Sequence, residues 1–169
     1  MLCFIALAFN LYGLALFLLL AGRIIDGLDG AVARAHEELE TGGGPTDLGG
    51  FYDIIADFIF YSGFVFFFAV GQPQHSLVAA FLIFSFIGSG CSFLAYSIIA
   101  TKHDMNHISQ GKKSFYYLHG LAEGTETILV FILICLLPGY FAIIAIMFGV
   151  ICWLTCLGRV LEARKTFGK

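Results

Sequence analysis

Charged residues are scarce in this sequence. Asp, Glu, Lys and Arg together make up 12% of the 169 residues, whereas hydrophobic residues make up 59%. Ordinary soluble domains carry about a quarter charged residues. A water-soluble fold has no use for so much apolar surface, so the composition predicts that the solvent of this chain is the lipid bilayer.

The hallmarks of several other protein classes are also missing. The net charge is −3 and no basic tract with interleaved aromatic residues occurs, which excludes a nucleic-acid partner. The apolar start lacks a preceding basic segment and a following small-residue cleavage site, so a cleaved signal peptide fits poorly. The five cysteines form no Cys-x-x-Cys pair, so neither a disulfide framework nor a thiolate metal site is expected.

Long apolar segments separated by turn residues predict an all-α, polytopic membrane helix bundle that forms a single domain over residues 1–169. A helix needs about 20 apolar residues to cross the hydrocarbon core. A break at Asn10 leaves a stub that rises only about 13 Å and cannot cross. This first helix is expected to be truncated, to begin upstream of Met1, or to be supported by a dimer partner. The expected elements are a stub over 1–9 and membrane helices over 11–34, 51–70, 76–100, 118–137 and 140–160.

Basic residues divide the connecting segments into two sets. Outside the interiors of the helices, Lys and Arg occur only at the last residue of helix 11–34, in the connection after helix 76–100 and at the carboxyl end. The positive-inside rule places these segments in the cytoplasm. Asp and Glu are absent from the opposite connections as well, so we expect the chemistry of the chain at its cytoplasmic face.

Four aspartates lie at the predicted cytoplasmic ends of two neighbouring helices. Asp26 and Asp29 are three residues apart, and Asp53 and Asp57 are four apart, so each pair occupies one helix face. The loop Ala35–Leu48 makes the two helices antiparallel and brings both pairs to the same depth. An intramembrane carboxylate costs about 2.5–3.5 kcal/mol at a helix centre, and clustered carboxylates also repel one another. Oxygen-only sites of this kind suit Mg²⁺ or Mn²⁺, so we expect a divalent-cation site.

These aspartates belong to a longer pattern. The run DGLDGAVAR at residues 26–34, followed by Gly49, Asp53 and Asp57, resembles the motif of the CDP-alcohol phosphotransferase family, D-x-x-D-G-x-x-A-R followed by G-x-x-x-D-x-x-x-D. All eight fixed residues are present. The 14 residues between Arg34 and Gly49 exceed the usual spacing of the family. The longer loop is expected to change the shape of the opening through which substrates enter and to leave the metal site unchanged.

The resemblance implies a function and a set of roles. It implies transfer of a substituted phosphate group from a CDP-alcohol, expected to be CDP-diacylglycerol, to an acceptor alcohol, with release of CMP, in phospholipid biosynthesis. It also implies the six-helix architecture of the family, here with its first helix reduced to a stub, and a centre of two Mg²⁺ or Mn²⁺ ions. The implied metal ligands are Asp26, Asp29, Asp53 and Asp57, with Asp57 also the catalytic base, and the implied CDP-binding residues are Asp29, Gly30, Ala33, Arg34 and Gly49.

A basic set marks a candidate acceptor site. Lys112, Lys113 and Arg159 are expected around the same cytoplasmic chamber, where they would suit an acceptor alcohol that carries a phosphate. The alternatives are ordinary positive-inside anchoring of the lysines and snorkelling of Arg159 to the interface.

Polar residues on helix 118–137 provide a second candidate for the acceptor side. His119, Glu123 and Glu126 share one helix face, and intramembrane carboxylates are functional candidates. The alternative is a satisfied polar network between helices. The segments 113–118 and 123–128 resemble a bacterial inner-membrane subgroup of the family, which implies the bacterial inner membrane as the location.

Two other functions remain open at this point. Carboxylates on membrane helices also mark ion pathways, so a divalent-cation transporter is the first alternative. A catalytically inactive membrane binding partner is the second. A homodimer is expected in the bilayer, and the sequence does not identify the acceptor alcohol.

Overall fold

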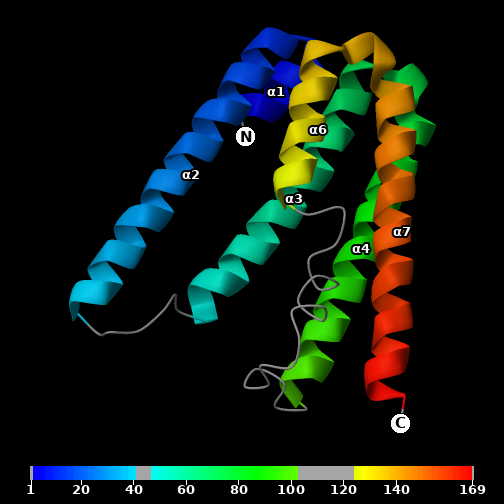
Figure 1. The fold of residues 1–169 in the computed structure, drawn as a ribbon. Helices are drawn as coiled ribbons and strands as arrows, with labels where there is room; N and C mark the ends of the chain where they lie inside the picture. Colours follow the sequence, from blue (N-terminus) through cyan, green and yellow to red (C-terminus); the bar gives the residue numbers. More distant parts are fainter. Residues whose placement is uncertain (1, 41–46, 103–123, 169) are drawn as a thin grey trace.

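The computed structural model describes the backbone of residues 2–40, 47–102 and 124–168, and this backbone is helical apart from short connections. The side chains of residues 26, 28–40 and 47 lie outside the described part of the structure. Figure 1 shows helices that meet at one end of the molecule, while α2 and α3 spread away from α4 and α7 toward the other end. The α-helices are α1 (Leu2–Ala8), α2 (Tyr12–Glu40), α3 (Asp47–Gly71), α4 (Ser76–Lys102), α6 (Gly124–Leu136) and α7 (Phe141–Phe167). The prediction of an all-α bundle is confirmed.

The break predicted at Asn10 is confirmed and has a local cause. Asn10 adopts a positive φ of 60°, a conformation that Asn tolerates better than most residues, and it separates the seven-residue α1 from α2. Its side-chain amide donates a hydrogen bond of 3.1 Å to the carbonyl of Gly71 at the end of α3. Tyr12 donates to the Asn10 side chain, and Gln72 donates to the Tyr12 hydroxyl. These bonds tie the short first helix to the turn between α3 and α4.

Two helices extend beyond the membrane segments predicted for them. α2 continues to Glu40 rather than ending at Arg34, and α7 continues to Phe167 rather than to residue 160. The added residues are mainly Ala, Leu, Glu, Arg and Lys, which are good helix formers in water. The apolar length that limits a membrane span does not limit a helix that continues beyond the hydrocarbon. α6 begins at Gly124, and residues 118–123 of the predicted helix 118–137 lie outside the described residues.

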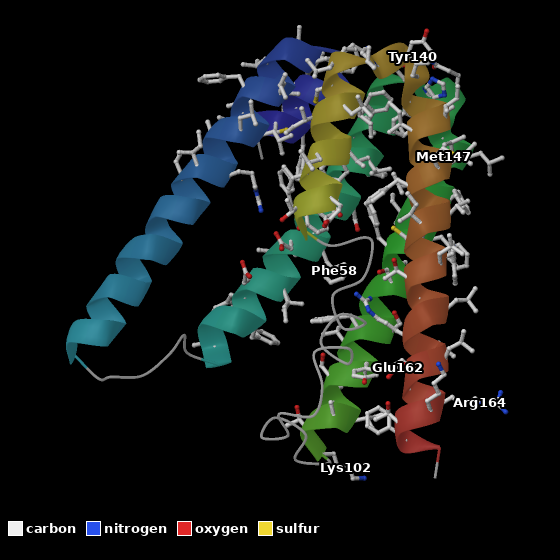
Figure 2. The ribbon with its side chains drawn as sticks, in the orientation of Figure 1. Phe58, Lys102, Tyr140, Met147, Glu162 and Arg164 are labelled. Atoms are coloured by element: carbon white, nitrogen blue, oxygen red, sulfur yellow. The ribbon has the colours of Figure 1, made fainter. Side chains whose placement is uncertain are left out.

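Three segments among the described residues are long and apolar enough to cross a membrane, namely Leu48–Gly71, Pro73–Lys102 and Pro138–Phe167. The segments Tyr12–Ile25 and Gly124–Leu136 are shorter apolar helices. Figure 2 shows Tyr140 at one end of the molecule and Lys102 and Arg164 at the opposite end, in agreement with the charge partition of the sequence.

The buried core lies at the end of the bundle where the helices meet. It combines α1, the start of α2, the second half of α3, the first halves of α4 and α7, and α6. Stacked rings dominate it, because Phe64 and Phe131 lie 4.0 Å apart and Phe68 and Phe141 lie 4.1 Å apart, measured between ring centroids. The packing continues along α4 and α7 toward the other end, whereas α2 and α3 diverge from them.

Candidate active site

A cavity of about 320 Å³ opens beside the divergent half of α3. Four helices contribute to its walls, and they bring together residues that are up to 106 positions apart in the sequence, from 53 to 159. Carboxylates, hydroxyls, aromatic rings and one guanidinium line it. The described lining residues are Asp53, Ile54, Asp57, Phe58, Tyr61, Phe86, Ser89, Gly90, Phe93, Gly124, Thr127, Cys152 and Arg159.

The carboxylate wall belongs to α3. Asp53 and Asp57 are one helical turn apart and both line the cavity, so the spacing predicted to place them on one face is confirmed. Arg23 of α2 approaches Asp57, with 3.3 Å between Nη1 and Oδ1. The Arg23 guanidinium also lies over the Phe60 ring, 5.2 Å from its centroid. Because both partners of the ion pair are about one-third exposed, the pair adds only about 0–1 kcal/mol to stability, and its main effect is to orient the carboxylate.

A second wall of the cavity, formed by α7 and α4, holds a buried cation. Arg159 of α7 is only 6% exposed, so the structure does not support snorkelling of this side chain to the interface. Its Nη1 donates a hydrogen bond of 2.9 Å to the carbonyl of Ser89 and lies 3.4 Å from the hydroxyls of Ser89 and Ser92 on α4. The guanidinium lies 5.4 Å from the centroid of Phe93. These contacts hold a positive charge at a fixed place in the cavity that Asp53 and Asp57 also line.

Close packing of α3 on α4 forms the floor between the two walls. The ring of Phe58 approaches Gly90 so closely that a Cβ atom on residue 90 would lie 2.3 Å from it. A side chain at this position would therefore force the Phe58 ring to shift, since real Cβ atoms essentially never approach another heavy atom so closely. In Figure 2 the labelled Phe58 projects from α3 toward α4.

The other predicted metal and CDP-binding residues lie on α2 and at the start of α3. The side chains of Asp26, Asp29, Ala33 and Arg34 are outside the described residues, as is that of Gly30, and only their helical backbone is described. The Arg23–Asp57 contact joins antiparallel helices, so the backbone of residue 26 continues toward the level of residue 53. Gly49 is exposed in the first turn of α3. Within the described residues, no three His, Cys, Asp or Glu side chains gather at metal-binding distances.

The predicted acceptor residues are only partly described. Lys112, Lys113, Glu123 and His119 lie outside the described residues. Glu126 is exposed in the first turn of α6 and is absent from the cavity lining, whereas its neighbour Thr127 is buried there.

Sequence reasoning missed several lining residues. Tyr61 follows Asp57 by one helical turn, so the face that carries the two aspartates could have predicted it. Ser89 and Phe93 of α4 gave no comparable signal, because their helix is apolar on all sides and its orientation depends on packing.

The fold and the cavity define a helical membrane protein with carboxylates and a buried arginine in one chamber. Comparison with known proteins identifies the class, since residues 1–160 match the CDP-alcohol phosphatidyltransferase family. The chain belongs to this family of transferases. It is 48% identical over 155 residues to "Inner membrane protein YnjF" of Escherichia coli (strain K12), an alignment that covers 91% of this chain and 72% of that protein. No solved structure matches the chain. Membership of a transferase family favours an enzyme over the cation transporter that the carboxylates alone left open.

Proposed function

We propose that this protein transfers a substituted phosphate group from a CDP-alcohol, CDP-diacylglycerol in the first instance, to an acceptor alcohol and releases CMP. The reaction would serve phospholipid biosynthesis. Its location would be the bacterial inner membrane, because the E. coli relative is named as an inner membrane protein. One observation carries the proposal: in a chain with the complete family motif, Asp53 and Asp57 line the same cavity as the buried Arg159. A cavity with acidic and basic walls suits a reaction that joins two phosphate-bearing substrates.

The proposed metal centre fits the donor set. Members of the family typically use a divalent metal. Asp26, Asp29, Asp53 and Asp57 would hold Mg²⁺ or Mn²⁺, two ions in all, because carboxylate oxygens are the ligands that these hard cations prefer. When bound, such ions neutralise the diphosphate of the donor and stabilise the departing CMP.

The residues of the chain supply the remaining steps. Asp29, Gly30, Ala33, Arg34 and Gly49 would bind the CDP group, with Arg34 near its phosphates. Asp57 would accept the proton of the acceptor hydroxyl. As that oxygen forms its bond to the phosphorus of the transferred group, the bond from the same phosphorus to the CMP oxygen breaks. A positioned base of this kind contributes about 10²–10⁴-fold to the rate.

Arg159 favours an acceptor that itself carries a phosphate. A guanidinium held in a cavity matches the geometry of a phosphate group with its fixed fork of N–H donors. Lys112 and Lys113 would add charge at the mouth of this site. Glu123 and Glu126 are proposed to lie on the acceptor side of the site, with Glu126 in the first turn of α6 outside the cavity lining.

The test is a reconstitution with CDP-diacylglycerol and a panel of acceptors that includes glycerol phosphate, inositol phosphate and their uncharged alcohols. Release of CMP that depends on one acceptor and is lost in Asp57→Asn would support the proposal. Absence of CMP release with every acceptor and with other CDP-alcohols would favour the inactive binding partner. The homodimer expected from the sequence is also proposed, and chemical crosslinking in native membranes tests it.

A further inference from the structure

Tyr61 is the most tightly enclosed polar side chain of the carboxylate wall. It is 7% exposed, and its ring is surrounded by four phenylalanine rings with centroids 5.9 to 6.4 Å away. Such a setting restricts the rotation of the ring, and Tyr61 also lines the cavity. The four rings belong to Phe58, Phe60, Phe86 and Phe131.

The Tyr61 hydroxyl meets Asp57 one helical turn earlier and forms a hydrogen bond with its carboxylate. The start of α6 closes over this contact. A Cβ atom on Gly124 would lie 3.0 Å from the Tyr61 oxygen and 4.0 Å from Oδ2 of Asp57. Arg23 lies at the other carboxylate oxygen, Oδ1. Asp57 is therefore bracketed by a guanidinium from α2 on one side and by a phenol from its own helix on the other.

We propose that Tyr61 is a positioning residue that fixes the Asp57 carboxylate for proton transfer, and that Gly124 leaves room for its hydroxyl, because a side chain there would press against the phenol oxygen. This inference rests on the proposed function, in which Asp57 accepts the acceptor proton. A carboxylate can rotate about two side-chain bonds, and a base acts only when it is oriented toward the proton it removes. The aromatic enclosure gives Tyr61 the rigidity that this task needs, and Arg23 provides the second point of attachment.

The first test is Tyr61→Phe, which keeps the ring in its enclosure and removes only the hydroxyl. We expect kcat to fall about 10- to 150-fold, the range of one hydrogen bond to a charged group, with both KM values within about threefold of wild type. Tyr52→Phe is the matched control, since Tyr52 is an exposed tyrosine on the same helix. In the Asp57→Asn background, Tyr61→Phe should cause little further loss, because Tyr61 acts through Asp57. Wild-type kcat in Tyr61→Phe, or full additivity with Asp57→Asn, would overturn the proposal.

The second test is Gly124→Ala, whose methyl group would crowd the hydroxyl. We expect a loss of kcat in the otherwise wild-type chain and a much smaller loss in the Tyr61→Phe background, where the crowded atom is gone. Gly13→Ala is the control, because a Cβ atom there meets open space. An equal loss in both backgrounds would show that Gly124 serves the backbone of α6 rather than Tyr61.

A readout without turnover separates this proposal from the proposed function. Melting temperatures of wild type, Tyr61→Phe, Asp57→Asn and the double variant form a double-mutant cycle, and contacting residues give non-additive changes. If the changes in melting temperature are non-additive and wild type releases no CMP, the Tyr61–Asp57 contact is supported and the proposed reaction is refuted. If the changes in melting temperature are additive and CMP release is normal, the role of Tyr61 is refuted and the proposed reaction is still supported.

Discussion

Replacement of Arg159 by lysine changes the shape of a buried cation and keeps its charge. In the structure the guanidinium donates to the Ser89 carbonyl at 2.9 Å and lies over Phe93 at 5.4 Å. An ammonium group has no planar fork, so it cannot keep these contacts and also present a pair of N–H groups to a phosphate. A hydrogen bond to a charged group contributes about 1.5–3 kcal/mol. At about 1.4 kcal/mol per factor of ten, the expected rise in the KM of a phosphorylated acceptor is about 10- to 150-fold.

The assay is CMP release in detergent–lipid micelles, with donor and acceptor varied separately. The KM of the CDP-alcohol should change by less than about threefold, because only the acceptor interaction is lost. Arg164→Lys is the control, since Arg164 lies on the same helix and points away from the bundle (Figure 2). An equal rise in both KM values would mean that Arg159 supports the cavity as a whole. If the best acceptor carries no phosphate and its KM still rises in Arg159→Lys, Arg159 does not bind an acceptor phosphate.

Three further predictions follow from the same cavity. Exhaustive chelation should abolish CMP release and lower the melting temperature. A hundredfold excess of Mg²⁺ over its Kd should restore about 2.7 kcal/mol of stability. Unchanged melting and turnover after chelation would exclude the metal centre. Asp57→Asn should bind a CDP-alcohol within about tenfold of wild type by isothermal titration but lose at least about 10²-fold in turnover, and near-normal turnover would mean that another group takes the proton. Gly90→Ala should lower the free energy of unfolding by about 1–3 kcal/mol in a denaturant titration, because its Cβ atom would collide with Phe58; a stability equal to that of wild type would contradict this packing.

The helices and most of their breaks could be predicted because they depend on local chemistry. Apolar length located the spans, and it also required a first break near Asn10, because one helix over residues 1–34 would be too long for a single crossing. The structure gives the local cause: Asn10 adopts a left-handed backbone and its side chain bonds to Gly71. The ends of α2 and α7 could not be placed by the same argument. Apolar length reports where the hydrocarbon ends, whereas the residues up to Glu40 and Phe167 continue the helix by their own propensity in water.

The candidate site could likewise be predicted only where it depends on local spacing. Spacing alone placed Asp53 and Asp57 on one face, and the cavity has both in its wall. The sequence left Arg159 undecided, because an arginine one turn inside a membrane helix can snorkel or turn inward with the same neighbours in sequence. Its choice depends on Ser89 and Ser92, which are distant in the chain and meet it only through the packing of α4 on α7. Tyr61 was missed for a different reason: it lies one turn beyond Asp57 on the face of the two aspartates, and that spacing is its only signal among the many aromatic residues of an apolar helix.

One half of the bundle contains the aromatic core, and the other half contains the candidate active site. Stacked pairs such as Phe64 with Phe131 fill the end where all the helices meet, and aromatic pairs of this kind contribute about 0.5–1.5 kcal/mol beyond their buried area. Toward the other end α3 diverges from α4, and the cavity there has small and polar lining residues such as Ser89 and Gly90 beside its aromatic ones. A cavity is tolerable there because the aromatic end fixes the relative positions of the helices. Tyr61 belongs to both halves, because its ring packs in the aromatic core and its side chain also lines the cavity. The rigid packing of the core can therefore hold the Asp57 carboxylate in place through the Tyr61 side chain.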